Sequence, residues 1–264
     1  MTTHTPLARF RLDLACGLSL LTRLPVLWLA PKSCHGQAWP MAHSVWCWPL
    51  IGAGIGAVTG TTLALLMLAH VPPLAAACLA LTVQTLLTGG LHEDGLADMA
   101  DGCGASTPQR RLEIMRDSRV GSYGVMALCL SYGIRAGALL AFSPVMAPLA
   151  CALAGGLARA AMLAIPAWLP PARADGLAHA LSPLPRRALL GAGLATLALC
   201  LGLGLALGAQ PAVLMAPALA ALVATYVVGR QARRLLGGYT GDVLGCCAVM
   251  ADCLALTTLA ALTG

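Results

Sequence analysis

The chain alternates between long apolar runs and shorter polar segments along its whole length. A helix needs about 20 apolar residues to cross a bilayer, and seven runs come close to or reach that length. These runs are residues 47–69, 73–91, 121–142, 148–169, 188–208, 212–229 and 241–263. The pattern predicts an all-α fold, a polytopic integral membrane helix bundle with about seven transmembrane helices. We expect one membrane-embedded domain over residues 1–264.

The connections between the runs fall into two alternating classes. Three are short and contain no lysine or arginine: residues 70–72, 143–147 and 209–211. The others each contain basic residues, and they are 31–46, 92–120, 170–187 and 230–240. By the positive-inside rule, the basic class lies in the cytoplasm.

The first apolar stretch, residues 12–30, is interrupted by Arg23 and Pro25. If this stretch crossed the membrane, Arg9 and Arg11 would lie outside, against the positive-inside rule. We therefore predict an interfacial or re-entrant helix in an N-terminal cytoplasmic segment, residues 1–46.

Composition supports a membrane protein and narrows the classes of function. Of the 264 residues, 59% are hydrophobic and 10% are charged, whereas a soluble domain has about 25% charged residues. Lys32 is the single lysine, and no GxxxxGK string of a P-loop occurs, which argues against a P-loop NTPase. The formal net charge of +6 is scattered, so we expect a lipid bilayer and no nucleic acid as partner. The sequence is also compatible with a homo-oligomer.

The glycines and cysteines of the apolar runs are expected to serve helix packing. Glycines repeat in the first long run in a way that suits close helix contacts, at Gly52, Gly54, Gly56 and Gly60. The eleven cysteines form no CxxC pair and lie mostly in apolar runs, so we interpret them as core residues, with a zinc or redox site as the alternative.

Six of the ten acidic residues fall between positions 93 and 117. Asp94, Asp98 and Asp101 are spaced i, i+4, i+7, which places them at roughly 0°, 40° and −20° around a helix. Three carboxylates on one face repel one another unless a cation neutralises them. Mg²⁺ binds through a few carboxylates together with substrate phosphates, so we predict a magnesium site on this face of a catalytic segment, residues 92–120.

Two further features bear on this prediction. Gly95 and Gly102 remove side chains beside Asp94 and Asp101, which we expect to leave room for a large ligand. The alternative is a solvated helix end, but such a face more often mixes lysine with glutamate, and residues 92–109 include no lysine or arginine.

The second half of this segment carries arginines, namely Arg110, Arg111, Arg116 and Arg119. Guanidinium groups match phosphate oxygens, and metal-binding carboxylates followed by arginines are what a diphosphate site requires. The alternative is that the arginines are topology anchors that pair with Glu113 or Asp117.

Charges inside the predicted spans are rarer. Arg135, Arg159 and Asp252 are functional candidates because intramembrane charges are costly; the alternative is that Asp252 pairs with one of the arginines. Asp242, at the start of the last run, either adds a metal ligand or caps a helix. The histidines His35, His43 and His92 have no partners at ligand spacing, although His92 adjoins the acidic face.

Three strings stand in the order TGGLHEDGLADMADG (88–102), RLEIMRDSRVGSYG (111–124) and GGYTGDVLG (237–245). Together with TRLPV (22–26), they resemble the cobalamin synthase family, also called adenosylcobinamide-GDP ribazoletransferase or cobalamin-5′-phosphate synthase. The other spans resemble the family in apolar character alone, and the last span departs from its pattern at Val249 and Asp252.

The resemblance implies a transferase of the bacterial inner membrane, with its active site facing the cytoplasm, that works late in adenosylcobalamin assembly. Adenosylcobinamide-GDP and α-ribazole, or its 5′-phosphate, would give adenosylcobalamin, or its 5′-phosphate, and GMP with Mg²⁺. The family motifs correspond here to Glu93, Asp94, Asp98 and Asp101, to Arg116, Asp117, Ser118 and Arg119, and to Thr240, Gly241 and Asp242.

The implied chemistry assigns roles to these residues. The expected metal ligands are Asp94, Asp98, Asp101 and Asp242. The expected binders of substrate phosphate are Arg116, Ser118, Arg119 and Arg159. A ribose hydroxyl attacks the cobinamide-side phosphorus and GMP departs, while Glu93 or Asp117 accepts the proton.

Two other functions compete with this interpretation. A CDP-alcohol phosphotransferase also clusters aspartates, but its pattern has Ala-Arg after DGxx, where this chain reads DGLAD (94–98). A transporter whose path is lined by Arg135, Arg159 and Asp252 would explain the spans but not the acidic cluster.

Overall fold

The computed structural model describes residues 5–26, 28–30, 39–206 and 211–263, so that Lys32 and His35 lie outside the described residues. Within the described residues the chain is helical, and its β-structure is limited to one isolated bridge between Pro171 and Tyr239. The predicted all-α class is confirmed. The elements are α1 (Pro6–Leu21), η2 (Met41–Cys47), α2 (Trp48–Leu68), α3 (Pro73–Thr88), α4 (Leu91–Gly102), α5 (Pro108–Ile114), α6 (Ser122–Leu139), α7 (Ala147–Met162), η3 (Ile165–Ala167), α8 (Gly176–Leu181), α9 (Arg186–Ala206), α10 (Pro211–Leu236) and α11 (Gly241–Thr263).

All seven predicted runs form helices, but the number of seven membrane crossings is not confirmed. Among the described residues, four segments are long and apolar enough to span a membrane: Met41–Leu68, Ala147–Ala167, Arg186–Ala206 and Gly241–Thr263. A fifth is obtained if α3 and α4, which meet at 93°, count as one broken span. α6 is not among the four, and it contains Arg135.

The bundle is built around α7 and α11, in which most residues are buried. α2 approaches α7 through Gly52, Gly56 and Gly60, where an added Cβ would collide with the α7 backbone. Such close approach is the means by which membrane helices pack without a hydrophobic driving force. The glycine face is therefore confirmed at these three positions, whereas a Cβ on Gly54 would meet no described atom within 4 Å.

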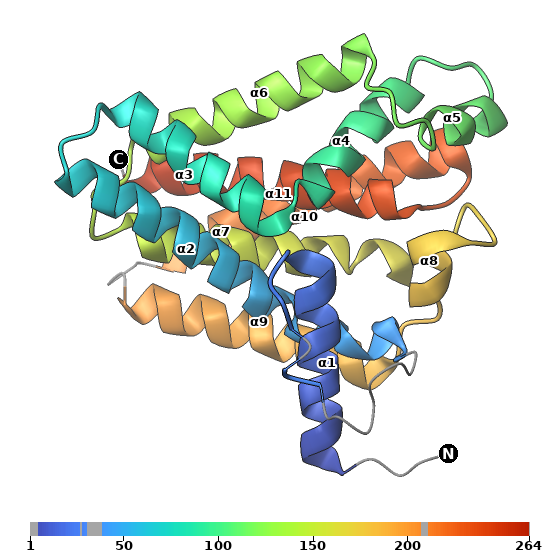
Figure 1. The fold of residues 1–264 in the computed structure, drawn as a ribbon, viewed down its shortest axis with the longest axis horizontal. Coiled ribbons are helices and arrows are strands. Elements are labelled where there is room, and N and C mark those ends of the chain that lie inside the picture. The colour runs from blue at the N-terminus through green and yellow to red at the C-terminus, as the bar shows by residue number, and fades with distance from the viewer. Residues whose placement is uncertain (1–4, 27, 31–38, 207–210, 264) are drawn as a thin grey trace.

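α1 has the orientation expected of an interfacial helix. Figure 1 shows it lying crosswise to α7, α9 and α11. On α1, Asp13 accepts hydrogen bonds from the indole N–H groups of Trp39 (2.8 Å) and Trp46 (3.0 Å), which tie the helix to η2. This orientation is compatible with a helix in the membrane plane, and the interfacial or re-entrant placement of residues 12–30 stays a prediction.

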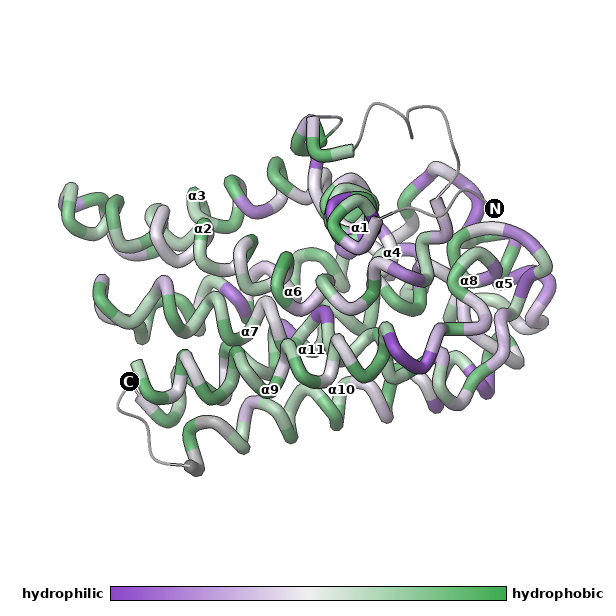
Figure 2. Tube along the Cα trace, turned by 90° about the horizontal axis from the view of Figure 1, so that it is seen from below, coloured by the Kyte–Doolittle hydropathy of each residue, from purple (hydrophilic) through white to green (hydrophobic). Residues whose placement is uncertain are grey.

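Polar residues gather at one end of the bundle. Figure 2 shows hydrophilic positions around α4, α5 and α8, whereas the opposite end, near the C-terminus, is mainly hydrophobic. With 12 residues, α4 alone is too short to cross a bilayer. It carries four carboxylates, and we place it at the polar end, outside the spans. This end of the molecule holds the candidate site.

Candidate active site

α4 begins at a sharp elbow after α3. Gly89 and Gly90 both have a φ of +69°, a left-handed conformation that glycine adopts readily. Arg23 packs on the elbow: its backbone N–H donates to an α3 carbonyl at 2.8 Å, and a side chain at Gly89 would collide with its guanidinium. The predicted span 73–91 was therefore too long, because the two left-handed glycines end the helix at Thr88.

α4 then packs backbone to backbone against the start of α11. A Cβ on Gly95 would lie 2.8 Å from the carbonyl oxygen of Asp242, and a Cβ on Gly245 would lie 3.2 Å from Cα of His92. The expectation that Gly95 and Gly102 leave room for a ligand was wrong. The missing side chain of Gly95 is replaced by the backbone of α11. The missing side chain of Gly102 is replaced by the side chain of Met115, which follows α5.

This packing brings together carboxylates from two helices. Asp94 and Asp242 line a cavity of about 180 Å³ among α1, α4, α7, α8 and α11. Asp98 follows one turn along α4, and burial together with the charges of Asp94, Asp242 and Asp101 raises its pKa to about 7. Like charges crowded in this way disfavour ionisation, and a bound cation would relieve the repulsion.

Asp101 belongs to the same face of α4 but already has partners. Its two carboxylate oxygens accept hydrogen bonds from the backbone N–H groups of Gly121 (2.7 Å) and Gly124 (2.8 Å), at the start of α6. A Cβ on either glycine would collide with the carboxylate. Asp101 therefore caps α6 and joins it to α4, and its role as a metal ligand stays a prediction.

The sequence left two roles open for Asp242, a metal ligand or the N-terminal cap of a helix. In the structure, Thr240 caps α11 instead. The hydroxyl oxygen of Thr240 accepts the N–H of Val243 at 3.3 Å. The same hydroxyl donates to the Asp242 carboxylate at 3.1 Å. Asp242 is therefore not the cap, and its carboxylate is held beside the cavity.

The chemistry of the carboxylate oxygens at this site fits a magnesium ion, but their arrangement alone does not. Asp94, Asp98 and Asp242 offer hard carboxylate oxygens in mutual electrostatic contact. Within the described residues, however, no three His, Cys, Asp or Glu side chains are arranged to hold one ion by themselves. Mg²⁺ usually takes one or two carboxylates and completes its octahedron with water and substrate phosphates, so these residues fit an ion that is shared with a substrate.

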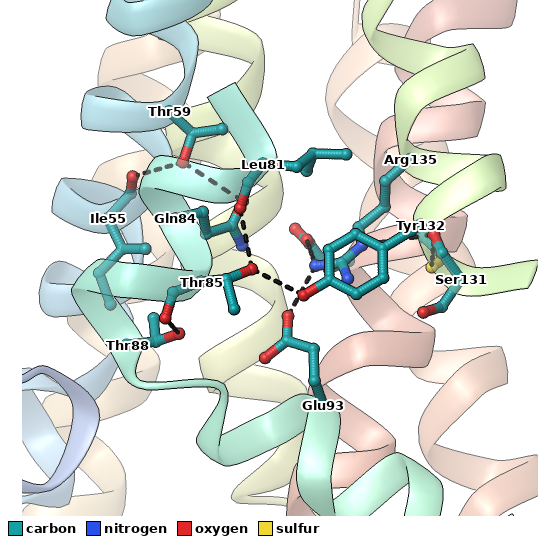
Figure 3. Close-up of polar contacts among 12 residues, drawn as sticks. Ile55, Thr59, Leu81, Gln84, Thr85, Thr88, Glu93, Ser131, Tyr132 and Arg135 are labelled. Atoms are coloured by element: carbon teal, nitrogen blue, oxygen red, sulfur yellow. Dashed lines mark hydrogen bonds and ion pairs between the residues drawn. The ribbon is translucent and has the colours of Figure 1, made fainter. Parts of the chain in front are cut away.

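Glu93 and the three charges of the predicted spans, Arg135, Arg159 and Asp252, form a buried network. Figure 3 shows Glu93 of α4 and Arg135 of α6 pointing toward each other, at 2.9 Å. Asp252 lies 3.8 Å from the same Arg135 nitrogen, so the pairing interpretation of Asp252 is confirmed. Arg159 is also buried, with Asp252, Glu93 and Arg135 as its charged neighbours. The structure thus does not bring Glu93 or Arg159 together with Arg116 and its loop.

The loop after α5 places its charges at the surface. Arg116 donates from Nη2 to both carboxylate oxygens of Asp175, at 2.7 and 2.8 Å. Arg119 pairs with Asp117 at 2.6 Å, and its hydrogen bonds lower the pKa of Asp117 to about 2. Ser118 between them is exposed. Two of the three predicted phosphate-binding arginines, Arg116 and Arg119, therefore already hold carboxylates.

His92 is a site residue to which the sequence assigned no role. It is buried, lines the cavity with Asp94 and Asp242, and neither ring nitrogen has a hydrogen-bond partner among the described residues. The signal in the sequence was its position beside the acidic face, but the contact with Gly245 that places it in the cavity is not local.

The fold and the site together define a polytopic helical membrane protein with a carboxylate-lined cavity at its polar end. The sequence model of Cobalamin-5-phosphate synthase matches residues 13–260. The chain therefore belongs to the cobalamin-5-phosphate synthase family.

Curated relatives cover nearly the whole chain. A protein of Azorhizobium caulinodans named adenosylcobinamide-GDP ribazoletransferase is 43% identical over 251 residues, which are 90% of this chain and 91% of the relative. Relatives with the same name from Rhizobium etli and Bradyrhizobium diazoefficiens are each 40% identical, over 95% and 88% of this chain and 97% and 87% of their own lengths. No solved structure matches the chain.

Proposed function

We propose that the chain joins adenosylcobinamide-GDP to α-ribazole, or to α-ribazole 5′-phosphate, in a Mg²⁺-dependent transfer late in cobalamin biosynthesis. The family membership and the name shared by its relatives support this reaction. The observation that carries the site assignment is that Asp94 of α4 and Asp242 of α11 line one cavity, with Asp98 one turn further along α4 and influenced by the charges of both.

The reaction exchanges one phosphorus–oxygen bond for another. A ribose hydroxyl of the acceptor bonds to the cobinamide-side phosphorus, the bridging oxygen leaves with GMP, and the hydroxyl proton goes to a base. A Mg²⁺ ion bound at the site would supply positive charge to the diphosphate and to the departing phosphate.

The residues of the chain hold and orient the reactants. Asp94, Asp98 and Asp242 would hold the metal, while Asp101 fixes α4 against α6. Of the two predicted bases, Glu93 is buried in an ion pair, whereas Asp117 lies on an exposed loop and is ionised. Asp117 is therefore the more accessible of the two, but its low pKa makes it a weak base, because general bases work best with a pKa near the operating pH.

We also propose that the polar end faces the cytoplasm of a bacterial inner membrane. Three predicted cytoplasmic connections meet there: Arg116 of 92–120 contacts Asp175 of 170–187, and Arg111 of 92–120 donates to the carbonyl of Leu235 in 230–240 at 3.2 Å. Concentration of arginines at one end satisfies the positive-inside rule. The neighbouring bilayer supplies the lipid partner.

The test compares carboxylate variants of the purified chain in detergent, with Mg²⁺ or with a chelator. Asp94→Asn and Asp98→Asn are expected to abolish GMP release, and the chelator is expected to do the same to the unaltered protein. Glu113→Gln is the matched control, because Glu113 is exposed and pairs with Arg110 away from the cavity. Full activity of both aspartate variants would refute the proposed metal site.

A further inference from the structure

The segment between η3 and α8 lies against the start of α11. The N–H of Ala172 donates to the Tyr239 carbonyl at 2.8 Å, and the N–H of Tyr239 donates to the Pro170 carbonyl at 2.9 Å. Gly238 permits this approach, because a Cβ there would collide with the Pro170 oxygen. Tyr239 is buried, and its hydroxyl donates to an α8 carbonyl at 3.1 Å. The segment is therefore fixed beside the first turn of α11.

Arg173 is the next residue of this segment. Its Nη2 donates to an α5 carbonyl at 2.8 Å, but its buried Nε has no hydrogen-bond partner among the described residues. The charged side chains around it are Asp98 of α4, Asp242 of α11, Asp175 of its own segment, and Arg116. A buried donor without a partner is costly, and this one stands next to the carboxylates of the candidate metal site.

Arg173 differs in this respect from Arg116 and Arg119, whereas Arg111 and Arg159 also have a buried Nε without a hydrogen-bond partner among the described residues. Arg116 and Arg119 are bound to Asp175 and Asp117, and their side chains are 56% and 87% exposed. Arg173 is half-buried, has Asp98 and Asp242 among its charged neighbours, and keeps a donor unused. A planar guanidinium with an unused N–H is suited to a phosphate oxygen.

We propose that Arg173 binds the diphosphate of the nucleotide-linked substrate, with its Nε donating to a phosphate oxygen beside the cation held by Asp98 and Asp242. The ligand class is a nucleoside diphosphate ester, and the inference rests on the proposed function. A bound diphosphate would give the Arg173 Nε the hydrogen bond that it lacks among the described residues, while Asp98 and Asp242 would hold the cation that neutralises the phosphate charge. In this proposal the acceptor nucleoside does not bind to Arg173.

The test uses the full-length chain, purified in detergent with Mg²⁺, and GDP as the probe. Arg173→Gln is expected to weaken GDP binding about 10-fold or more, and to raise KM for adenosylcobinamide-GDP without raising KM for α-ribazole. Arg173→Lys is expected to recover part of the GDP affinity, since it keeps the charge but loses the planar group. Arg187→Gln is the control, because Arg187 is exposed at the start of α9 and does not line the cavity; its GDP affinity is expected to stay within twofold.

Two results would overturn the role of Arg173. One is GDP affinity of Arg173→Gln equal to that of the unaltered protein. The other is an equal rise of KM for both substrates, which a merely structural role would produce. If Arg173→Gln fails to fold, unchanged GDP affinity in Arg173→Lys decides against the proposal in the same way. Failure of the proposed function gives a different pattern: the unaltered protein would release no GMP, while the binding comparison would still report on Arg173.

Discussion

Glu93 and Arg135 form an ion pair of 2.9 Å in which the two side chains are 9% and 1% exposed. The pair joins the helix that carries the candidate metal ligands to α6, and Asp252 extends it to α11. Tyr132 covers the guanidinium, with its ring centroid 4.6 Å from Cζ of Arg135. The buried charges therefore join α4 to α6 and α11.

Removal of Arg135 should destabilise the fold more than removal of a surface arginine. Arg135→Met leaves two buried carboxylates without their partner, which costs about 3–5 kcal/mol. Arg110→Met breaks an exposed pair and should cost about 1 kcal/mol or less. Thermal unfolding of both variants in detergent measures the difference, and equal Tm values would show that the buried network contributes nothing to stability.

Asp101 should affect stability as well as activity. Asp101→Asn keeps one carbonyl oxygen for the two N–H groups of Gly121 and Gly124, so we expect a loss of about 0.5–2 kcal/mol. Gly124→Ala should cost more, because its Cβ would collide with the carboxylate. Unfolding of both variants is measured without Mg²⁺. Unchanged stability of Asp101→Asn combined with lost Mg²⁺ response would instead assign Asp101 to the metal alone.

Gly95 should be required for activity through the position of α4. In Gly95→Ala the new Cβ would lie 2.8 Å from the Asp242 carbonyl oxygen, closer than real Cβ contacts allow, so α4 and α11 must separate. We expect kcat for GMP release to fall about 10-fold or more, because small displacements of reacting groups slow a reaction strongly. Gly54→Ala is the control on an open helix face and should retain kcat. Equal kcat values would show that the contact at Gly95 does not set the site.

The rise of Tm on addition of Mg²⁺ should depend on Asp242. A ligand that binds the folded state alone raises Tm in a concentration-dependent way. We expect Mg²⁺ to raise Tm of the unaltered protein in the presence of GDP, and Asp242→Asn to lose most of that shift. Thr240→Ala loses the cap but keeps the carboxylate, so it should lower Tm and still respond to Mg²⁺. An undiminished shift in Asp242→Asn would remove this residue from the metal site.

Local periodicity predicted much of the fold. Every predicted apolar run became a helix, and the spacing of Asp94, Asp98 and Asp101 correctly placed them in one short helix, α4. The elbow at Gly89 and Gly90 was missed because hydrophobicity continues across it to Leu91, while the bend depends on two left-handed residues.

The details of the site depend on contacts between segments far apart in the chain. Asp101 is bound by backbone N–H groups 20 and 23 residues later, and Arg116 is bound by a carboxylate 59 residues later. The segment that carries Arg173 is fixed by Tyr239. Side-chain type and spacing predict which groups are available, but not which of them the tertiary structure has already paired.

The most direct test of the central claim is the release of GMP by the purified, unaltered chain in detergent. We expect GMP release only when adenosylcobinamide-GDP, α-ribazole or its 5′-phosphate, and Mg²⁺ are all present, with one corrinoid product formed for each GMP. GMP release that does not depend on the acceptor, or no release by folded protein with every component present, would contradict the assignment as a ribazole transferase.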